Sequence, residues 1–522
     1  MKKYMNKIVS AAAVIVAVSS CQLDFAPTDG GSGDELLKNA SSAVSIVDGI
    51  YRSMWTPGWS TGENTHQCFG IAAYNVALDS MGDDFIMQSM GNGWFWYDHC
   101  YNVKPFYTSN AFRPYDVWNA NYTWISNANY VLAAASTMAG SSEDVAYVLG
   151  NAYAIRALSY FNLANWYARP PYSAPLDSSS DGKYRWSDPG VPIYTAPTYK
   201  NFTGKKRENL ETVFKQINDD LDTAIELLEQ GKNSALGGTK SHIDYYVALG
   251  IKTRVAMAVG DWETALSSAE KIIKSGKYTV GGSSELMNGM NSISSSNVMW
   301  GAGIESMEQS GGYANFFTHM DNQDGEYAKS APKLINSSLY KQMGAEDIRR
   351  AWWDPEDKES PYIAHKFHFQ NVAVFLGDYI YMRVEEIYFD AAEAALRSGD
   401  VDKAVQYTND VMKKRDANYD ASRYSGTLLG STTVSWTGSL LENILIQKRI
   451  ELWGEMGRLV DVRRLGQGID RKKSDGFADE CLSTMAGNGV NLSSPDTYDW
   501  VMSIPQDEIN NNPNINEEDQ NP

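Results

Sequence analysis

A Gly-Asp pair interrupts helical hydrophobic patterns at two distant places in the chain, and it constrains the fold more than any other feature. Apolar residues at three-and-four spacing run up to Gly260-Asp261 and resume after it, and the same happens at Gly399-Asp400. Glycine readily takes the left-handed conformation that ends a helix, and aspartate caps the start of the next. Ala265 and Ala404 follow at the same offset. The pattern predicts helix hairpins of the tetratricopeptide type, whose neighbours must stack to close a core.

Further stretches with helical spacing predict a mainly α body. Apolar residues from Leu210 to Leu228 mark one face of an amphipathic helix over 209–228. Two more helical stretches, 115–138 and 142–166, are expected to form another pair. The segments between helices are rich in Gly, Ser, Asn, Asp and aromatic residues, and they cover 55–112, 169–207, 281–327 and 417–438. Segments of this length usually carry function, so we expect a helical scaffold that presents irregular loops.

The composition narrows the kinds of partner. Among 522 residues, 64 Asp and Glu against 45 Lys and Arg give a formal net charge of −19. This argues against nucleic acid or an anionic membrane surface as the main partner, because both require excess positive charge. Aromatic residues reach 12%, a surplus that indicates recognition surfaces as well as core. The four cysteines, Cys21, Cys68, Cys100 and Cys481, are too scattered for a disulfide framework or a zinc cluster.

The N-terminus has the pattern of a secretory signal. Three lysines precede an apolar run from Ile8 to Val18, which is too short to span a bilayer. Because Val18-Ser19-Ser20-Cys21 resembles a bacterial lipobox, we expect residues 1–20 to be removed and Cys21 to carry the lipid, with palmitate among its acyl chains. The alternative is an ordinary signal that is cut near a cysteine. Residues 21–34 have the composition of a flexible tether. No later segment approaches 18 uninterrupted apolar residues, so we expect a body over 35–522 that is anchored and does not span the membrane.

Several motifs follow one another along this body. They are RALSYFNL at 156–163, GVP at 190–192, the stretches from Glu211 to Ile225 and from Arg383 to Ala395, and ELWGEMGRLVDVRR at 451–464. The chain closes with IPQDEI at 504–509, NP at 512–513 and QNP at 520–522. In this order the motifs resemble those of the SusD/RagB family of surface glycan-binding lipoproteins from the Bacteroidetes. The departures from the family pattern lie in scaffold motifs: Ala168, Met456, Leu459 and an insertion before Gly190.

The resemblance implies a mainly α SusD-like fold, in which tetratricopeptide-like hairpins form a right-handed scaffold with long irregular loops. An N-terminal part would cover about 35–230 and a C-terminal part about 240–522. It also implies a lipid-anchored protein at the outer surface of the outer membrane, which binds an oligo- or polysaccharide without catalysis for uptake through a SusC-like TonB-dependent transporter. The charged motif residues are expected to pair with carboxylates or cap helices. They are Arg156, Arg458, Asp461, Arg463 and Arg464.

The candidate binding residues follow from the chemistry of sugars. A pyranose ring offers an apolar face, which aromatic rings match, and a rim of hydroxyls, which Asn, Asp, Gln and Arg match. The stretch 91–101 crowds such residues beside two glycines, and Trp94 and Trp96 would face the same side if it were extended. The Gly- and Asn-rich stretch 311–324 is the second candidate, in a part of the chain where the resemblance places a binding aromatic, and the turn at Trp59 is the third. The predicted ligand-binding residues are Asn92, Trp94, Trp96, Tyr97 and Tyr101; Tyr313, Phe316, His319 and Asp321; and Trp59.

Other interpretations of these residues stay open. The rings can equally be buried core, because Trp is highly buried on average; Trp300, Trp352, Trp353 and Trp436 are assigned to the scaffold. The acids of 79–84 and 385–393 could pass for glycosidase pairs, but the sequence does not show the fixed separation that two catalytic carboxylates need. On a chain this acidic they are expected to be solvated or capping. His365 and His368 lack a third metal ligand nearby. A surface glycoside hydrolase and a peptide-binding member of the same family are the alternative functions. No cofactor is expected, and the sequence is silent on a structural Ca²⁺.

Overall fold

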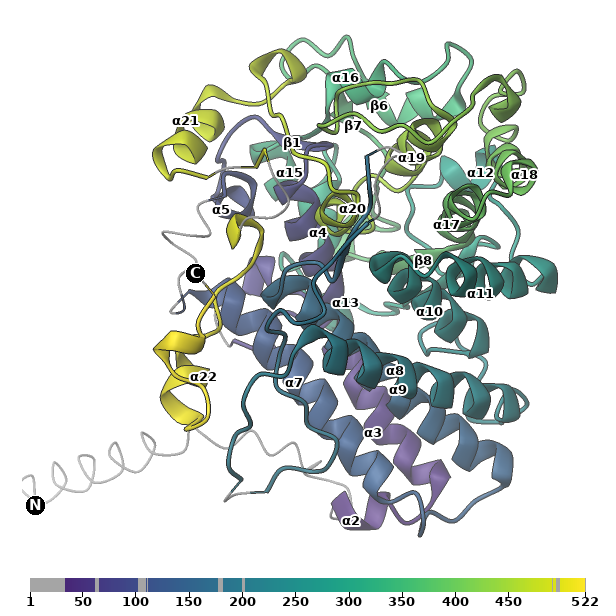
Figure 1. Ribbon diagram of the computed structural model, residues 1–522, viewed down its shortest axis with the longest axis vertical. Helices are drawn as coiled ribbons and strands as arrows, with labels where there is room; N and C mark the ends of the chain where they lie inside the picture. The colour runs from purple at the N-terminus through teal and green to yellow at the C-terminus, as the bar shows by residue number, and fades with distance from the viewer. Residues whose placement is uncertain are drawn as a thin grey trace, which may run out of the picture.

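The computed structural model describes residues 33–61, 65–101, 109, 111–176, 182–199, 202–490, 492–493 and 498–521. Figure 1 shows long helices in the lower and right-hand parts of the molecule, and short strands and irregular segments in the upper part. One large hydrophobic core includes residues from both parts. The prediction of a mainly α fold is therefore confirmed.

The scaffold is a continuous series of packed helices. The contacts run from α7 (Phe112–Ala133) to α8 (Ser142–Tyr167), α9 (Leu210–Gln230), α10 (Tyr245–Val259), α11 (Trp262–Ser275), α17 (Val384–Arg397) and α18 (Val401–Met412). The helix α3 (Ala40–Ser53) packs on α7 and α8, and α19 (Leu440–Glu451) packs on α17. Because α11 contacts α17, the two hairpins that the sequence separates by more than a hundred residues are stacked in space, as the tetratricopeptide pattern requires.

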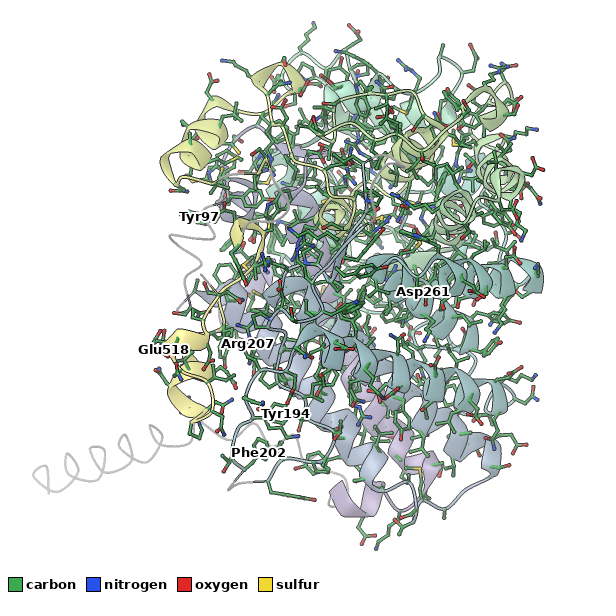
Figure 2. All side chains as sticks on the ribbon, viewed as in Figure 1. Tyr97, Tyr194, Phe202, Arg207, Asp261 and Glu518 are labelled. Carbon is green, nitrogen blue, oxygen red and sulfur yellow. The ribbon has the colours of Figure 1, made fainter. Side chains whose placement is uncertain are left out.

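The Gly-Asp pairs end and start helices as predicted. Gly260 follows α10 with φ of 73°, and the Asp261 side chain accepts a hydrogen bond from the backbone N of Thr264 at the start of α11; Figure 2 labels Asp261 at this junction. Gly399 has φ of 88°, and the Asp400 side chain caps α18 in the same way. In both hairpins a left-handed glycine and a side-chain cap satisfy backbone groups that the helix ends leave unpaired.

One long helix lies inside a segment that the sequence predicts to be irregular. The helix α4 (Ile71–Met81) is buried at every position except Asn75. Because neighbouring elements surround it, its sequence lacks the polar face on which the helical pattern depends. The shorter helices are α2 (Gly33–Leu36), α5 (Trp96–His99), α12 (Ser283–Leu286), α13 (Met307–Ser310), α14 (Phe316–Met320), α15 (Glu326–Ser330), α16 (Ser337–Tyr340), α20 (Arg458–Arg464), α21 (Asp479–Gly487) and α22 (Gln506–Asn511). The 3₁₀ turns are η1 (Thr65–Gln67), η2 (Ile348–Trp352), η3 (Val372–Val374), η4 (Ala421–Arg423), η5 (Lys473–Asp475), η6 (Tyr498–Trp500) and η7 (Glu517–Asp519).

Short strands tie the irregular segments to one another. A four-stranded sheet has the order β1 (Phe85–Met87), β5 (Lys333–Ile335), β7 (Ile363–Ala364) and β6 (Trp353–Asp354). Within it, Met87 pairs with Lys333, which joins the predicted loop 55–112 to the segment that follows the predicted loop 281–327. Antiparallel pairs are also formed by β2 (Tyr172–Ser173) with β3 (Lys183–Tyr184) and by β4 (Val298–Ala302) with β8 (Tyr379–Arg383).

The acidic residues that the sequence predicts to be solvated or capping are buried, and all of them except Asp79 are in ion pairs. Asp83 and Asp84 lie within 3.3 Å of the guanidinium groups of Arg449 and Arg458. Asp79 accepts a hydrogen bond from the backbone N of Arg458, and its burial raises its pKa to about 7. The exposed fractions of Glu385, Glu386 and Glu393 are 0%, 2% and 0%. The expectation of solvation was wrong because only the fold brings basic residues opposite these acids.

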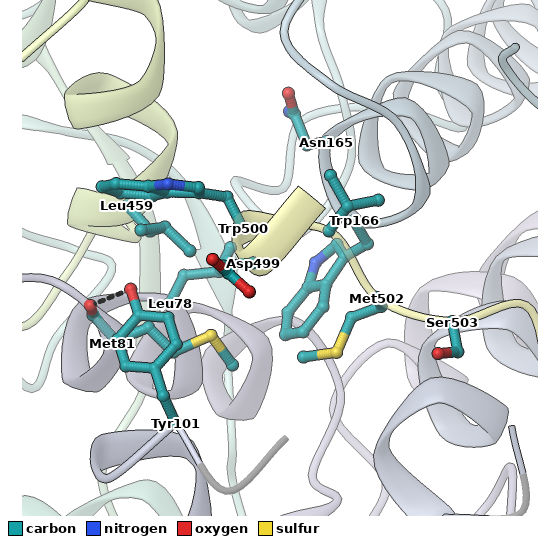
Figure 3. Close-up of a pocket in the computed structure, with 11 residues that line it drawn as sticks. Leu78, Met81, Tyr101, Asn165, Trp166, Leu459, Asp499, Trp500, Met502 and Ser503 are labelled. Atoms are coloured by element: carbon teal, nitrogen blue, oxygen red, sulfur yellow. Dashed lines mark hydrogen bonds between the residues drawn. The ribbon is translucent and has the colours of Figure 1, made fainter. Parts of the chain in front are cut away.

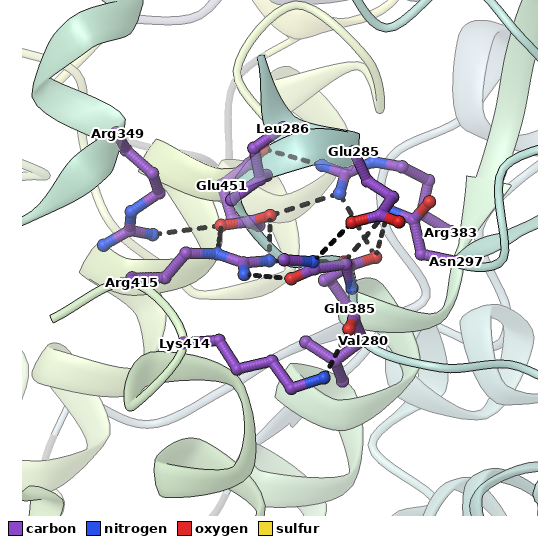
Figure 4. A network of polar contacts seen from close by, with 12 residues as sticks. Val280, Glu285, Leu286, Asn297, Arg349, Arg383, Glu385, Lys414, Arg415 and Glu451 are labelled. Atoms are coloured by element: carbon purple, nitrogen blue, oxygen red, sulfur yellow. Dashed lines mark hydrogen bonds and ion pairs between the residues drawn. The ribbon is translucent and has the colours of Figure 1, made fainter. Parts of the chain in front are cut away.

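Glu451 lies at the centre of the largest of these networks (Figure 4). The guanidinium groups of Arg349, Arg383 and Arg415 approach its carboxylate to 3.3, 3.1 and 2.8 Å. Burial opposes ionisation of Glu451, but the positive charges of Arg415 and Arg383 hold its pKa well below the usual range. The network joins α19 to β8, to η2 and to the segment after α18, so these acids stabilise the scaffold.

The charged motif residues are engaged as predicted. Arg156 pairs with Asp220 at 2.6 Å, and Arg464 pairs with Glu393 at 2.7 Å and with Asp461. Arg463 differs, because it donates to the backbone carbonyls of Asn165 and Ala168. The indole rings of Trp300, Trp352 and Trp353 are buried in the core, and that of Trp436 is partly buried against it. In the described ranges, no helix has the length and apolar character needed to cross a membrane. Residues 1–20 and Cys21 lie outside the described residues.

Candidate functional site

The three predicted binding stretches meet at one place in the fold. A Cβ on Gly311 would lie 2.3 Å from Cγ of Pro57, so the loop after α13 lies directly on the turn that carries Trp59. A Cβ on Gly91 would lie 2.8 Å from the Ser330 hydroxyl, so the stretch before Trp94 lies on the end of α15. Both glycines have positive φ, of 71° and 52°. Close approach and backbone conformation together require glycine at these positions.

Trp94 is partly buried and lies between two other rings. It stacks on His66, with ring centroids 5.2 Å apart and planes 21° apart. Its other neighbour is Tyr327 of α15, at 6.0 Å in an edge-to-face arrangement. The Tyr327 hydroxyl also bonds His66 Nδ1 at 2.8 Å, which fixes the two neighbours relative to each other. Aromatic pairs in these geometries attract beyond the area they bury, so Trp94 is held in one orientation.

The row of rings continues from Tyr327 to the second predicted stretch. Tyr313 lies 6.2 Å from Tyr327, and Phe375 lies 5.0 Å from Tyr313, with interplanar angles of 50° and 59°. Tyr313 is 50% exposed, and the other rings are partly buried. We call His66, Trp94, Tyr313, Tyr327 and Phe375 the aromatic surface. It combines apolar ring faces with hydroxyl, imidazole and indole groups, the combination that a sugar requires.

A layer of buried rings supports the aromatic surface. Phe95 and His319 have exposed fractions of 0% and 1%, and the His319 ring stacks on Phe69 at 5.6 Å and contacts Tyr327 at 4.9 Å. His319 Nε2 donates to the backbone carbonyl of His66. Burial, together with the nearby Lys333, lowers the pKa of His319 well below its ordinary value. A neutral imidazole in this layer positions the His66 backbone from below.

Asp321 organises the segments around the surface. Its carboxylate accepts hydrogen bonds from the backbone N of Phe369, Gln323 and Asp324 at 3.0 to 3.1 Å and lies 3.2 Å from His368 Nδ1. Burial opposes its ionisation, but the bonds from His368 and Phe369 keep the pKa of Asp321 below the ordinary value, and the same contact raises the pKa of His368. Asp321 is 0% exposed. Its role in this structure is to hold two loops together.

The structure separates the predicted residues into exposed and buried groups. Asn92 and Tyr97 are exposed, Tyr97 at 37% (Figure 2), and Trp59 is partly buried with its ring stacked 6.4 Å from that of Trp124. Trp96, Tyr101 and Phe316 are buried, with exposed fractions of 2%, 1% and 8%. Trp94 and Trp96 would face the same side only if the stretch 91–101 were extended. It is not, because Phe95 has φ of 62° and α5 begins at Trp96. Trp96 therefore faces the core, and these three rings act as support.

Three rings of the aromatic surface were not among the predicted residues: His66, Tyr327 and Phe375. Tyr327 stands at the end of the predicted loop 281–327, and His66 and Phe375 stand alone among polar or aliphatic neighbours in the sequence. Phe375 has φ of 56° and follows η3, which presents its ring to Tyr313. Because these residues meet only through the tertiary fold, local clustering gave no signal for them.

A small cavity beside Tyr101 is not a sugar site (Figure 3). Its volume is about 20 Å³, and Leu78, Trp166 and Trp500 are among the residues that line it. This is room for about one water molecule. Elsewhere, in the described ranges, no three His, Cys, Asp or Glu side chains gather closely enough to hold a metal ion. The open aromatic surface is therefore the site with the best match to a ligand.

Two family models match the chain. Residues 58–255 match a model described as "Starch-binding associating with outer membrane", of the SusD-like type, and residues 369–522 match the model of the SusD family. Together they cover well over half of the chain, in the order that the motifs have. The chain belongs to the SusD/RagB family. No match was found among curated proteins.

Solved structures share the fold across almost the whole chain. A SusD-like carbohydrate binding protein from Bacteroides vulgatus is 22% identical with a TM-score of 0.70, over 92% of this chain and 98% of that one. A SusD superfamily protein from Bacteroides thetaiotaomicron is also 22% identical, with a TM-score of 0.72 over 93% and 100%. Surface glycan-binding protein A from the latter organism, in complex with laminarihexaose, is 15% identical, with a TM-score of 0.60 over 92% and 99%. The fold is therefore SusD-like.

Proposed function

We propose that this protein binds an oligo- or polysaccharide on the aromatic surface. The observation that carries the proposal is the row of partly exposed rings from Trp94 through Tyr327 and Tyr313 to Phe375, built from three separate segments on a buried support. The solved relative that holds laminarihexaose supports the same class of ligand. If each stacked sugar contributes about 1 kcal/mol, two or three sugars with a few hydrogen bonds give affinities from about micromolar to millimolar.

Binding without catalysis fits the environment of Asp321, the predicted binding carboxylate. Glycosidases need one carboxylic acid that can donate a proton and a second carboxylate at the scissile bond. Asp321 is fully buried, and hydrogen bonds already occupy its oxygens. It can reach no substrate and has no proton to give at neutral pH, because its pKa is lowered. We therefore propose that the protein captures a glycan and does not cleave it.

The family and the N-terminal sequence support a proposal for the cellular role. We propose that residues 1–20 direct export, that a lipid on Cys21 anchors the protein at the cell surface, and that residues 21–34 form the tether. We further propose that the bound glycan is passed to a SusC-like TonB-dependent transporter in the outer membrane. The family description that places such proteins with the outer membrane supports this role. Weak binding suits it, since the ligand must be released again.

The binding proposal is tested by affinity electrophoresis of the protein through gels that contain different polysaccharides. At least one polysaccharide should retard the protein, and Trp94→Ala and Tyr313→Ala should each weaken that binding about fivefold, since a lost stack is worth roughly 1 kcal/mol. Tyr199→Ala is the control, because Tyr199 is 71% exposed and packs on Tyr130 of α7 beside the loop with Tyr194 and Phe202 (Figure 2). Unchanged retardation of both variants would exclude this surface.

Four further measurements test the alternatives and the cellular role. Release of reducing ends from a retained polysaccharide would favour a hydrolase, and competition by peptides would favour a peptide-binding member of the family.

Cys21→Ala should move the protein from the outer-membrane fraction to the soluble fraction. A transporter of the SusC type should co-purify with the detergent-solubilised wild type from the native membrane, and its absence from such preparations would contradict the proposed partner.

A further inference from the structure

Two buried thiols from distant parts of the sequence meet close to the candidate site. Cys100 directly follows α5, Cys481 lies in α21, and both have an exposed fraction of 0%. Cys481 Sγ lies 3.7 Å from the carbonyl oxygen of His99, the residue before Cys100, and the two thiols lie close enough for each to shift the pKa of the other. Figure 1 shows α5 and α21 beside each other at the upper left. The spacing of the cysteines in the sequence gave no sign of this pair.

A positive charge lies against the pair. Arg471 Nη1 is 3.9 Å from Cys481 Sγ, and its Nε and Nη2 donate to the carbonyls of Gly82 and Ser80 at 3.0 and 2.9 Å. The hydrogen bond from Cys100, with help from the charge of Arg471, lowers the pKa of the Cys481 thiol. Arg471 Nη1 also donates to the carbonyl oxygen of His99, the residue before Cys100, so the guanidinium group holds the two cysteine segments together in the fold.

Cys481 is also the point at which α21 is attached. Of the nine described residues of α21, Cys481 is the buried one, while Leu482 and Met485 pack against the core only in part. The partner, Cys100, ends the short segment that begins with Trp94 and continues through α5. A covalent bond here would fix the C-terminal part of the chain to the segment that supplies one ring of the aromatic surface.

We propose that Cys100 and Cys481 form a disulfide bond in the exported protein. This inference rests on one part of the proposed function, the export of the chain, because disulfides persist outside the reducing cytosol. The oxidant is another disulfide, of a small thiol or of a dithiol protein. The Cys481 thiolate attacks one sulfur of that disulfide and releases a thiolate; Cys100, after losing its proton, then attacks Cys481 Sγ and releases the second thiolate. The oxidant takes up two electrons and becomes two thiols.

The timing of this reaction follows from burial. Both sulfurs are inaccessible in the fold, so exchange takes place before α21 docks, while the chain is still folding. Because the bond closes a loop of most of the chain, it removes many conformations from the unfolded state. We expect it to stabilise the protein even though the bond itself joins two short segments.

Peptide mapping of the full chain is the direct test. The protein is produced with its N-terminal segment, unfolded in the presence of an alkylating reagent, digested without reductant and analysed by mass spectrometry. We expect the peptides of Cys100 and Cys481 to appear joined, lighter by the two thiol hydrogens, and Cys68 to appear alkylated. Cys68 is the matched control, because it is also buried, with an exposed fraction of 2%. Alkylation of Cys100 and Cys481 in the protein refolded under oxidising conditions would overturn the proposal.

Refolding in a glutathione redox buffer separates this inference from the proposed export. If the protein isolated from cells is reduced but the joined peptide forms on refolding, the bond is supported and export is contradicted. Reduction should lower the midpoint of thermal unfolding by a few degrees in the wild type and equally in Cys68→Ala. The double variant Cys100→Ala/Cys481→Ala should show no response to reductant. An equal response in this double variant would overturn the proposal.

Discussion

Trp94 stacks on His66 with ring centroids 5.2 Å apart, and His66 is in turn fixed from below by the hydrogen bond that its carbonyl accepts from His319. Trp94 therefore depends on a residue from another segment for its orientation. His66→Ala should leave the indole free to turn and weaken glycan binding by roughly two- to tenfold, the worth of one ring contact. His66→Phe keeps a ring at this place and should retain most of the affinity. The two variants can be compared by affinity electrophoresis on a polysaccharide that the wild type binds.

The comparison is specific because both variants remove the bond between His66 Nδ1 and the Tyr327 hydroxyl. Equal loss in both would mean that this hydrogen bond matters and the ring stack does not. Equal retention would mean that Trp94 is oriented by Tyr327 alone.

Lys333 is a buried lysine whose ammonium group donates to the backbone carbonyl of Ala331. It is 1% exposed, and within the described ranges no carboxylate pairs with it. Burial lowers its pKa from the ordinary value of 10.5 to about 7. Between these two values the unfolded chain holds a proton that the fold does not, so stability increases with pH by about 1.4 kcal/mol per pH unit from this group. Below about pH 7 Lys333 is protonated in both the folded and the unfolded state, so the full cost of burying its charge lowers the stability of the fold.

Lys333→Met should therefore stabilise the protein at neutral pH, since a side chain of similar length fills the same space without a charge. The gain in urea midpoint over the wild type should be largest at pH 7 and should shrink toward pH 10. Lys329→Met is the matched control, because Lys329 is exposed on α15 beside Glu326. A gain that does not vary with pH would show that Lys333 is protonated in the fold.

Sequence patterns predicted those helices that have one polar face and clear ends. The amphipathic α9 and the Gly-Asp junctions at Gly260 and Gly399 appear where the spacing placed them, because local backbone chemistry decides them. The helix α4 could not be predicted in this way, since almost every residue is buried and periodicity vanishes.

The candidate site was predictable only in part, for a related reason. Trp94 and Tyr313 belong to visible clusters of aromatic and polar residues, whereas His66 and Phe375 join them through contacts made in the fold. The prediction for Trp96 was wrong because one residue, Phe95, takes a left-handed conformation. This ends the alternation of side chains on which that prediction depended.

Arg156 forms a buried, two-pronged ion pair with Asp220, through Nε at 2.8 Å and a terminal nitrogen at 2.6 Å. Arg156→Met should lower the free energy of unfolding by about 3–5 kcal/mol, because it leaves the Asp220 carboxylate buried without its partner. Arg156→Met/Asp220→Leu should recover most of the loss. The control is Lys215→Met, which breaks the exposed ion pair of Lys215 with Asp219 on the helix that carries Asp220. It should change the free energy of unfolding little. Urea denaturation followed by tryptophan fluorescence measures all three; a double variant as unstable as the single one would contradict the account.

The two hairpin glycines have the same backbone conformation but different surroundings, and this predicts unequal costs of substitution. Gly260 and Gly399 have φ of 73° and 88°, so alanine at either position costs about 1–2 kcal/mol of backbone strain. A Cβ on Gly260 would also lie 2.7 Å from the Tyr172 ring, whereas one on Gly399 would meet nothing within 4 Å. Tyr172 is packed against Tyr184 and Trp262 and cannot easily move. Gly260→Ala should therefore lower the midpoint of thermal unfolding more than Gly399→Ala.

A second pair of variants separates the contact from the strain. In a Tyr172→Leu background the ring that obstructs the new methyl group is absent, so the difference between Gly260→Ala and Gly399→Ala should shrink toward zero. Differential scanning calorimetry of the four single and double variants measures it. If the difference persists without the ring, Gly260 is required for its backbone conformation alone, and the close approach of Tyr172 to this junction contributes nothing to the stability of the first hairpin.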